Sequence, residues 1–298
     1  MPEPEAATAG RESFGSRLGR AMAGRGPLCV GIDPHPALLQ RWGLNDDAAG
    51  LERFSLTVLD AVGPLAAAVK PQVALYERHG SVGMAVLERT LAAAADASVL
   101  TIADAKRGDI GSTMAAYADA WLRDGSALAA DSVTLSPYLG FESLRPALDL
   151  AAQTGRGVFV LALTSNPEGA SVQHVGGADS VARRIVRAAA AENQRYFTSN
   201  TSNNQLAAPD LGSVGLVVGA TVGSALTDLD LDLAAVRGPI LAPGLGAQGA
   251  TAADLRRTFG AAYGQVLGTS SREILGAGPR VQDLRDAAQR TLEELRLA

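Results

Sequence analysis

The sequence predicts an α/β protein built as a single closed (β/α)₈ barrel, the TIM barrel. Eight short apolar stretches alternate with helical patterns along the chain, and 298 residues suit one large barrel. Hydrophobic residues make up 47% of the chain, which is ample for a sizeable core, and no linker or shift in composition separates a second domain. A doubly wound open sheet is the alternative that the same alternation leaves open.

The expected strands are short apolar runs of the kind that a parallel sheet buries on both faces. They lie at Leu28–Asp33, Ala67–Lys70, Val99–Asp104, Ser132–Leu135, Gly157–Leu163, Val214–Gly219, Pro239–Ala242 and Gln265–Gly268. The helical patterns between them cover residues 49–62, 77–95, 111–128, 141–153, 177–193, 222–235, 250–259 and 281–296. A further short helix at Glu12–Met22 precedes the first strand.

Two segments lie outside this alternation. Residues 1–13, of which the first ten are polar and acidic, are expected to form a disordered N-terminal tail ahead of a catalytic barrel domain that spans residues 14–298. Residues 194–212 are rich in Ser, Thr and Asn and show little periodicity. They are expected to form a polar insertion with the character of a mobile surface loop.

The composition argues against several classes of function. The net charge is −5 and no Lys/Arg block is present, so we expect no nucleic-acid partner. No apolar run approaches 18 residues, so we expect no membrane span. The N-terminus lacks a basic-then-apolar signal pattern and the lone Cys29 has no partner for an intrachain disulfide, which favours a cytoplasmic protein. The three histidines show no metal-ligand spacing, so we expect no metal.

Charged residues gather where the third strand ends, in the stretch SVLTIADAKRGDIGST at positions 98–113. Asp104 and Lys106 share a strand parity, so both side chains can point into one space, and Asp109 lies near a helix start that favours a carboxylate. A solvated loop with a surface ion pair and an N-cap is the simpler interpretation. Lys70, however, ends the preceding strand in the same way, and the carboxyl ends of barrel strands share the face that carries active sites.

The last two strands end in small and polar residues that suit a phosphate. In PGLGAQGAT, Gly244 and Gly246 allow backbone N–H groups to approach an oxyanion, and the next strand ends in GTSSRE, which supplies Arg272. An ordinary tight turn and a surface helix cap are the alternatives for these two loops. Because phosphate sites recur after strands 7 and 8 of such barrels, we expect a phosphorylated substrate. The residues TSN at 164–166 either hydrogen-bond a polar ring or close a turn.

Five motifs in this order carry a resemblance to a known family. They are GIDPHP, VKPQ, DAKRGDIGST, TSNPEG, and PGLGAQG followed by SSRE. Together they resemble orotidine 5′-phosphate decarboxylases, most of all the bacterial branch with longer chains, over nearly the whole chain from Phe14 onwards. The resemblance implies loss of CO₂ from orotidine 5′-monophosphate to give uridine 5′-monophosphate, the last step of de novo pyrimidine synthesis. It also implies that neither a metal nor an organic cofactor takes part.

The resemblance assigns a charged network to Lys70, Asp104, Lys106 and Asp109. Lys106 would be the general acid that protonates C6 of the pyrimidine ring. Asp109 and Thr113 would reach into the site of a neighbouring subunit, so that the working unit would be a homodimer.

The same resemblance assigns the substrate contacts. Asp33 would bind the ribose, Ser165 the pyrimidine, and Arg272 with Gln248 the phosphate. Two other functions stay open at this point. One is a metal-dependent hexulose- or ketogulonate-phosphate lyase of the same superfamily, and the other is a catalytically silent barrel that binds nucleotides.

Overall fold

The computed structural model describes residues 11–200, 211–246 and 249–297. Eight parallel strands close into a barrel in sequence order, and β8 pairs with β1 to complete it. The strands are β1 (Leu28–Ile32), β2 (Ala68–Pro71), β3 (Leu100–Arg107), β4 (Ser132–Leu135), β5 (Gly157–Leu163), β6 (Val214–Val218), β7 (Ile240–Pro243) and β8 (Val266–Ser270). The predicted closed barrel is confirmed, and the open sheet is excluded.

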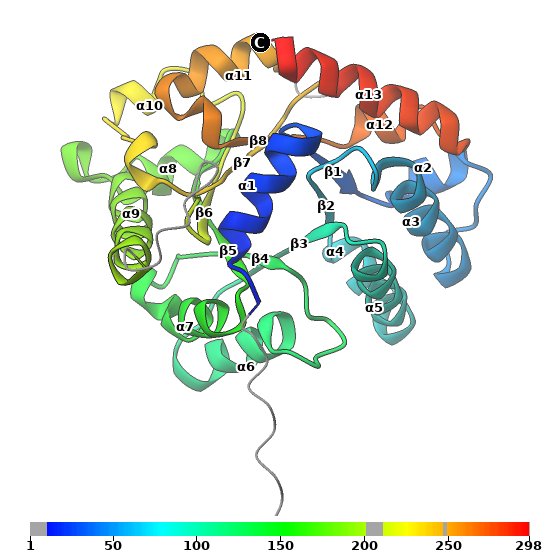
Figure 1. The fold of residues 1–298 in the computed structure, drawn as a ribbon, viewed down its shortest axis with the longest axis horizontal. Helices are drawn as coiled ribbons and strands as arrows, with labels where there is room; N and C mark the ends of the chain where they lie inside the picture. The colour runs from blue at the N-terminus through cyan, green and yellow to red at the C-terminus, as the bar shows by residue number, and fades with distance from the viewer. Residues whose placement is uncertain (1–10, 201–210, 247–248, 298) are drawn as a thin grey trace, which may run out of the picture.

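Helices surround the barrel, and Figure 1 shows them arranged around the central strands. They are α1 (Phe14–Arg25), α2 (Pro36–Arg41), α3 (Ala48–Val62), α4 (Ala74–Glu77), α5 (Gly80–Asp96), α6 (Gly111–Leu122), α7 (Arg145–Thr154), α8 (Ala170–Gln173), α9 (Val181–Asn200), α10 (Ala225–Asp228), α11 (Ala252–Phe259), α12 (Arg272–Leu275) and α13 (Val281–Leu297). Five short 3₁₀ helices, η1 (Phe141–Leu144), η2 (Pro167–Gly169), η3 (Gly177–Asp179), η4 (Ala234–Val236) and η5 (Gly260–Gln265), join them.

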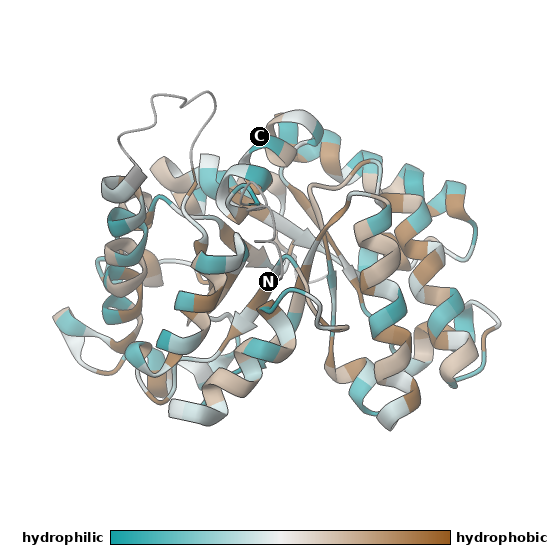
Figure 2. Cartoon of the chain, turned by 60° about the horizontal axis from the view of Figure 1, so that its bottom comes forward, coloured by the Kyte–Doolittle hydropathy of each residue, from teal (hydrophilic) through white to brown (hydrophobic). Residues whose placement is uncertain are grey.

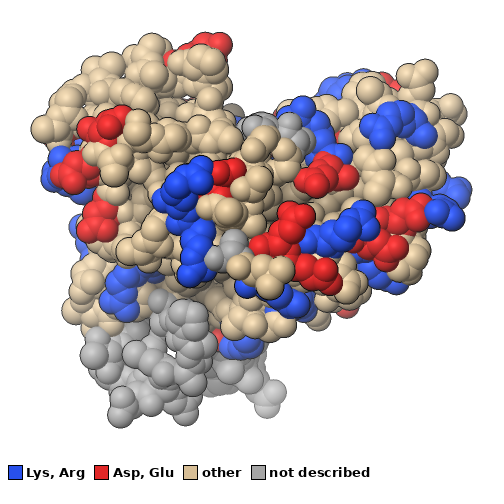
Figure 3. Space-filling view, turned by 90° about the horizontal axis from the view of Figure 1, so that it is seen from above, with Lys and Arg blue, Asp and Glu red and all other residues tan. Residues whose placement is uncertain are grey.

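The outer helices are amphipathic. Hydrophilic and hydrophobic residues alternate along them in Figure 2, as expected for helices that pack one face on a sheet. On the face seen in Figure 3, where α11 and α13 lie, acidic and basic side chains are interspersed. No helix among the described residues is long and apolar enough to cross a membrane.

The helix predicted over residues 222–235 is wrong for most of its length. Only the single turns α10 and η4 form there, separated by Asp230 with a φ of 49°. Short polar side chains compete for local hydrogen bonds in this segment: the Ser224 hydroxyl donates to Asp228, and Asp232 accepts from the backbone N–H of Ala235. Such local bonds offer the backbone an alternative to a continuous helix.

The loop predicted from residue 194 is wrong over residues 194–200, because α9 continues to Asn200. The hydroxyls of Thr198 and Ser199 donate to carbonyls four residues earlier, which is compatible with a helix. The guanidinium of Arg237 also lies 3.8 Å from the ring centroid of Phe197. Residues 201–210, the rest of the expected insertion, lie outside the described residues.

Helix α1 lies across one end of the barrel (Figure 1). Its Phe14 ring packs edge-on against Phe159 of β5, and a Cβ on Gly157 would lie only 2.2 Å from the Phe14 ring. The cluster of buried residues that fills the barrel interior consists of Phe14, Leu18, Cys29, Ala67, Ala68, Ile102, Phe159, Val217, Leu241 and Leu267. Because α1 seals the end at which the strands begin, the end at which they finish is left for a site.

The N-terminal tail differs from its prediction at residues 11–13. Ser13 caps α1 by accepting a hydrogen bond from the N–H of Ser16, and Arg11 forms an ion pair with Asp124. Caps of this kind typically stabilise a helix by about 1 kcal/mol. Residues 1–10, for which disorder was expected, lie outside the described residues.

Candidate active site

The carboxylate of Asp104 holds two ammonium groups at the open end of the barrel. Strand β3 continues to Arg107, three residues beyond its prediction, so Asp104 and Lys106 lie on one strand. The Nζ of Lys106 lies 2.6 Å from Oδ1 of Asp104, and the Nζ of Lys70 on β2 lies 2.8 Å from Oδ2. The parity argument for Asp104 and Lys106 is therefore confirmed, as is the convergence of Lys70 on the same point.

Lys70 and Lys106 are the only lysines of the chain, in which every other basic residue apart from the histidines is an arginine. This difference matters chemically because an ammonium can give up a proton, whereas a guanidinium does not deprotonate in proteins. Both side-chain ammonium groups of the chain are thus placed on one carboxylate.

Asp104 receives two further hydrogen bonds from neutral side chains. The Gln72 amide donates to Oδ2 over 3.2 Å, and the Thr134 hydroxyl donates to Oδ1 over 3.0 Å. Sequence reasoning assigned no role to either residue. Gln72 stands in the VKPQ motif and could have been suspected, but Thr134 lies in the short strand β4 outside every motif and carried no signal.

Burial and charge act in opposite directions on this network. Asp104 is only 8% exposed, and burial disfavours its ionisation, but the charges of Lys70 and Lys106 outweigh this and hold the pKa of the carboxyl well below its usual 3.8. Burial alone would lower the pKa of Lys70, yet the charges of Asp104 and Asp33 raise it above its usual 10.5. Lys70 and Asp104 therefore remain ionised at neutral pH. The side chain of Lys106 is more accessible than these two: 45% of it is exposed, and it lines the cavity.

Asp33 follows β1 on the same rim. Its Oδ2 accepts a hydrogen bond from the Ser271 hydroxyl, which follows β8. Its Oδ1 is buried and has no hydrogen-bond partner in the described structure. A buried carboxylate oxygen without a donor is costly unless a ligand or water supplies one. Asp33 therefore offers an acceptor that a ligand hydroxyl can use.

The side of the rim predicted to bind phosphate is only partly described. Gly244, with a φ of 114°, and Arg272 line the cavity, and the guanidinium of Arg272 has no carboxylate partner among the described residues. Gly246 also has a positive φ of 74°, but its N–H donates to the carbonyl of Ala250, so it does not point to a ligand. Gln248 lies outside the described residues.

Three further predicted site residues do not line the cavity in this chain. Asp109 contacts its own neighbour, with Oδ1 accepting a 2.8 Å hydrogen bond from the N–H of Ile110. Thr113 is exposed on the first turn of α6, and Ser165 is exposed just after β5, where Thr164 lines the cavity instead. The network within one chain is therefore Lys70, Asp104 and Lys106.

The cavity at this rim has a volume of about 970 Å³. It is lined by Asp33, His35, Pro36, Ala37, Leu38, Arg41, Lys70, Gln72, Asp104, Lys106, Leu161, Thr164, Val217, Leu241, Pro243, Gly244, Leu245, Thr269, Ser271 and Arg272. The lining thus combines three apolar side chains from β5, β6 and β7 with the charged side chains from β2 and β3. Within the described ranges, no group of three His, Cys, Asp or Glu side chains is arranged to hold a metal ion.

Comparison with known proteins identifies the same family throughout. Residues 26–287 match the model of the "Orotidine 5′-phosphate decarboxylase / HUMPS family". The chain is 56% identical to an orotidine 5′-phosphate decarboxylase of Salinispora arenicola, and the match covers 96% of this chain and 98% of the relative. It is 54% identical to that of Streptomyces coelicolor with the same coverage. A crystal structure from Streptomyces avermitilis, provisionally assigned to the same activity, superposes with a TM-score of 0.89 at 54% identity over 99% of each chain.

Proposed function

This chain belongs to the orotidine 5′-phosphate decarboxylase / HUMPS family, and we propose that Lys106 is the general acid of its decarboxylation reaction. The reaction removes CO₂ from orotidine 5′-monophosphate and leaves uridine 5′-monophosphate. The observation that carries the proposal is the partly exposed ammonium of Lys106, held 2.6 Å from a buried carboxylate inside the cavity.

The reaction calls for a cation that can also donate a proton. Loss of CO₂ from C6 leaves a carbanion in the plane of the pyrimidine ring, where no carbonyl can delocalise it. A preorganised positive charge at that carbon stabilises the developing charge. An ammonium then supplies the proton as well, which a metal ion or a guanidinium does not.

Asp104 acts on both the lysine and the substrate. It keeps Lys106 oriented through the 2.6 Å contact, while the buried Lys70 supports it from the other side. Its charge also faces the carboxylate that is to leave. Two like charges at about 4 Å and an effective dielectric near 20 repel by roughly 4 kcal/mol. That repulsion disappears as the substrate carboxylate becomes neutral CO₂.

The rest of the nucleotide is bound along the rim. The free Oδ1 of Asp33 accepts from a ribose hydroxyl, and Arg272 in the same cavity pairs with the phosphate. By the family resemblance, Ser165, exposed on the loop after β5, would contact the pyrimidine, and Gln248, which lies outside the described residues, would contact the phosphate. Binding energy from the phosphate and ribose is then available to position C6 against Lys106 in the transition state.

A homodimer completes the site in this proposal. Asp109 and Thr113 lie outside their own cavity, beside an exposed apolar surface formed by Ile110, Tyr138 and Leu139. The two loops that carry this surface touch, since the N–H of Ser136 donates to the carbonyl of Arg107. Exposed apolar patches of this kind are typical of interaction sites. The cytoplasmic location and the absence of a nucleic-acid partner stay predictions from the sequence.

The test is the loss of orotidine 5′-monophosphate absorbance in a buffer that contains EDTA, with the wild type and Lys106→Ala. We expect turnover by the wild type alone, while uridine 5′-monophosphate still binds to the variant. Substantial turnover by Lys106→Ala would overturn the role of the lysine. Activity that EDTA abolishes would favour the metal-dependent lyase, and tight nucleotide binding without turnover would favour the silent barrel.

A further inference from the structure

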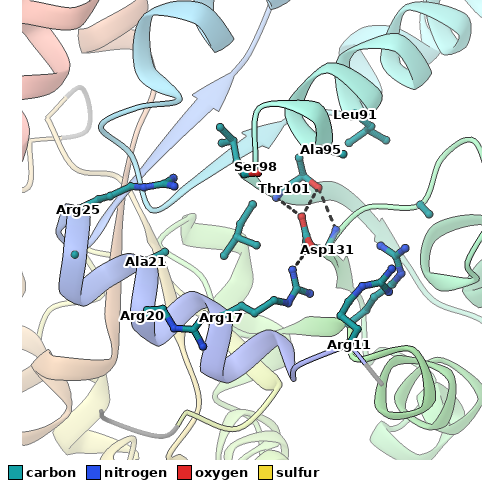
Figure 4. A pocket seen from close by; sticks show the side chains of 15 residues that line it. Arg11, Arg17, Arg20, Ala21, Arg25, Leu91, Ala95, Ser98, Thr101 and Asp131 are labelled. Atoms are coloured by element: carbon teal, nitrogen blue, oxygen red, sulfur yellow. Dashed lines mark hydrogen bonds and ion pairs between the residues drawn. The ribbon is translucent and has the colours of Figure 1, made fainter. Parts of the chain in front are cut away.

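A second cavity, of about 590 Å³, lies at the opposite end of the barrel, between α1 and the ends at which strands begin. Five of its lining residues are arginines: Arg11, Arg17, Arg20, Arg25 and Arg156. Three of the five come from α1, and Figure 4 shows them on one side of the cavity with Thr101 and Asp131 facing them. None of the lining residues belongs to the active-site cavity.

The positive charge around this cavity exceeds the negative charge that compensates it. Arg11 and Arg156 share a single carboxylate, that of Asp124. In the described part of the chain, Arg25 forms no ion pair, and its guanidinium donates hydrogen bonds only to the neutral carbonyls of Gly63 at 3.5 Å and Ala66 at 3.3 Å.

The remaining two arginines each have one carboxylate partner. Arg17 pairs with Asp131, and Arg20, whose side chain is 67% exposed, pairs with Glu12. Asp131 is fully engaged, because it also accepts hydrogen bonds from the N–H and the hydroxyl of Thr101, at 2.9 and 3.2 Å. Five guanidinium groups therefore meet three carboxylates, which leaves a surplus of two positive charges.

One buried donor in this cavity lacks an acceptor. Arg156 is only 8% exposed, and its Nε has no hydrogen-bond partner in the described structure, although its other nitrogens bind Ala130 and Asp124. Buried donors in folded proteins are nearly always satisfied by protein, water or ligand. The cavity wall therefore holds a guanidinium whose hydrogen-bonding capacity the chain itself does not use up.

We propose that this cavity binds a small organic phosphate through these arginines. The two surplus charges match a phosphate dianion, and guanidinium groups recognise phosphate oxygens through paired hydrogen bonds. The lining also includes the apolar side chains of Leu91, Val99 and Leu100, against which the organic part of the ligand packs. The phosphate lies against Arg20 and Arg25, the two arginines of the cavity nearest the C-terminal end of α1. The inference does not rest on the proposed function, because the two cavities share no residue.

The test is a calorimetric titration of ribose 5-phosphate into the enzyme at low salt, with the active site saturated by uridine 5′-monophosphate. We expect one further binding site per chain, and an affinity that falls steeply with added salt. Arg25→Gln and Arg20→Gln are each expected to weaken this binding roughly ten-fold or more, the usual effect of losing a charge-assisted hydrogen bond. Arg290→Gln removes the same charge from an exposed position on α13 outside the cavity and is expected to change nothing.

Two results would overturn the proposal: no binding by the saturated wild type, or binding that neither cavity variant weakens. If Arg25→Gln does not fold, the exposed Arg20→Gln still decides the question. The titration of ribose 5-phosphate is also repeated with the Arg272→Gln variant in the absence of uridine 5′-monophosphate. This measurement separates the proposal for the second cavity from the proposed function of the active site. Failure of the active-site assignment would alter the nucleotide titration, but it would not alter the contrast between Arg20→Gln and Arg290→Gln.

Discussion

The hydroxyl of Thr134 donates a 3.0 Å hydrogen bond to Oδ1 of Asp104 and accepts a 2.9 Å bond from the backbone N–H of Lys106. Lys106 has a φ of 48°, a backbone conformation that residues other than glycine rarely adopt. The Thr134 hydroxyl, which accepts from the N–H of Lys106, helps to hold the backbone in this conformation. One fully buried hydroxyl on β4 thus positions both the carboxylate and the lysine.

Replacing Thr134 by Val keeps the shape of the side chain and removes the hydroxyl. Because a buried N–H and a carboxylate oxygen each lose a partner, we expect the free energy of unfolding to fall by about 1–3 kcal/mol. We expect kcat to fall roughly ten-fold or more, since Lys106 is no longer held toward the ring. Steady-state kinetics and urea unfolding measure the two effects.

Thr90→Val is the matched control, because the Thr90 hydroxyl is also buried and bonds only outside the active site, to the carbonyl of Val86 over 2.8 Å and to Tyr76. It is expected to lose stability with little loss of kcat. Thr134→Ser retains the hydroxyl and is expected to retain most of the activity. Equal kinetics for Thr134→Val and the wild type would refute the positioning role.

Chemical acetylation offers a test of Lys106 that needs no substitution. The chain contains two lysines, and the side chain of Lys70 is only 7% exposed whereas that of Lys106 is 45% exposed. We expect an amine-acetylating reagent to inactivate the enzyme in step with acetylation of Lys106, as followed by peptide mass spectrometry. Uridine 5′-monophosphate is expected to protect both the residue and the activity. Inactivation that runs ahead of Lys106 acetylation would speak against its role.

Asp104→Asn tests the electrostatics of the network through pH. Breaking a buried ion pair by removing one partner costs about 3–5 kcal/mol, because the buried Lys70 is left without its counter-charge. Because the pKa of Asp104 is lowered in the folded protein, its contribution to the free energy of unfolding is fully present above the usual pKa of 3.8. That contribution is lost as the pH falls below this value. Because the pKa of Lys70 is raised in the folded protein, its contribution to the free energy of unfolding is fully present below the usual pKa of 10.5. That contribution is lost as the pH rises above this value.

The difference in the free energy of unfolding between wild type and Asp104→Asn is therefore expected to be largest and flat between these two values. This difference in the free energy of unfolding is expected to become smaller below 3.8 and above 10.5, as measured by urea unfolding at a series of pH values. Asp119→Asn is the control, because this carboxylate pairs with Arg123 while both side chains are more than half exposed, at 60% and 57%, and such pairs are worth at most about 1 kcal/mol. A pH-independent difference for Asp104→Asn would contradict the assignment.

Mixing two inactive variants tests the shared site. If Asp109 acts in the partner's cavity, equal amounts of Lys106→Ala and Asp109→Ala form mixed dimers with one intact site each. Half of the dimers are then mixed, so activity is expected to return to about a quarter of the wild-type value. Lys106→Ala mixed with Lys70→Ala is the control, since both lysines serve the same cavity and no intact site forms. Recovery in the control alone, or in neither mixture, would remove Asp109 from the neighbouring site.

Arg272→Gln tests the phosphate contact. We expect kcat/KM for orotidine 5′-monophosphate to fall roughly ten- to hundred-fold, the usual effect of losing a charge-assisted hydrogen bond. The nucleoside orotidine carries no phosphate, so its slow turnover is expected to be unchanged by the substitution. Arg41→Gln is the control, because Arg41 lines the same cavity but its guanidinium donates to the carbonyl of Gly276 at 2.9 Å. Equal losses with both substrates would indicate a structural role for Arg272 instead.

Strand positions were largely predictable because the barrel strands are buried on both faces and leave uninterrupted apolar runs in the sequence. Helices were less predictable where polar side chains decide the local structure. Over residues 222–235 the periodicity favoured a helix. In the structure, Ser224 and Asp232 form hydrogen bonds within the segment, and no continuous helix forms. At residues 194–200 polarity suggested a loop, and α9 continues because its hydroxyls bond back to the helix.

The sequence by itself determined the barrel and the identities of the charged residues at its rim. These follow from local patterns, namely alternating apolar runs and the spacing of Lys70, Asp104 and Lys106. Only the tertiary structure decided which partners those charges have. Thr134 on β4, the free oxygen of Asp33 and the arginine-lined cavity beneath α1 all depend on contacts between distant segments. Parallel strands and the helix across their ends create such contacts, and no local pattern records them.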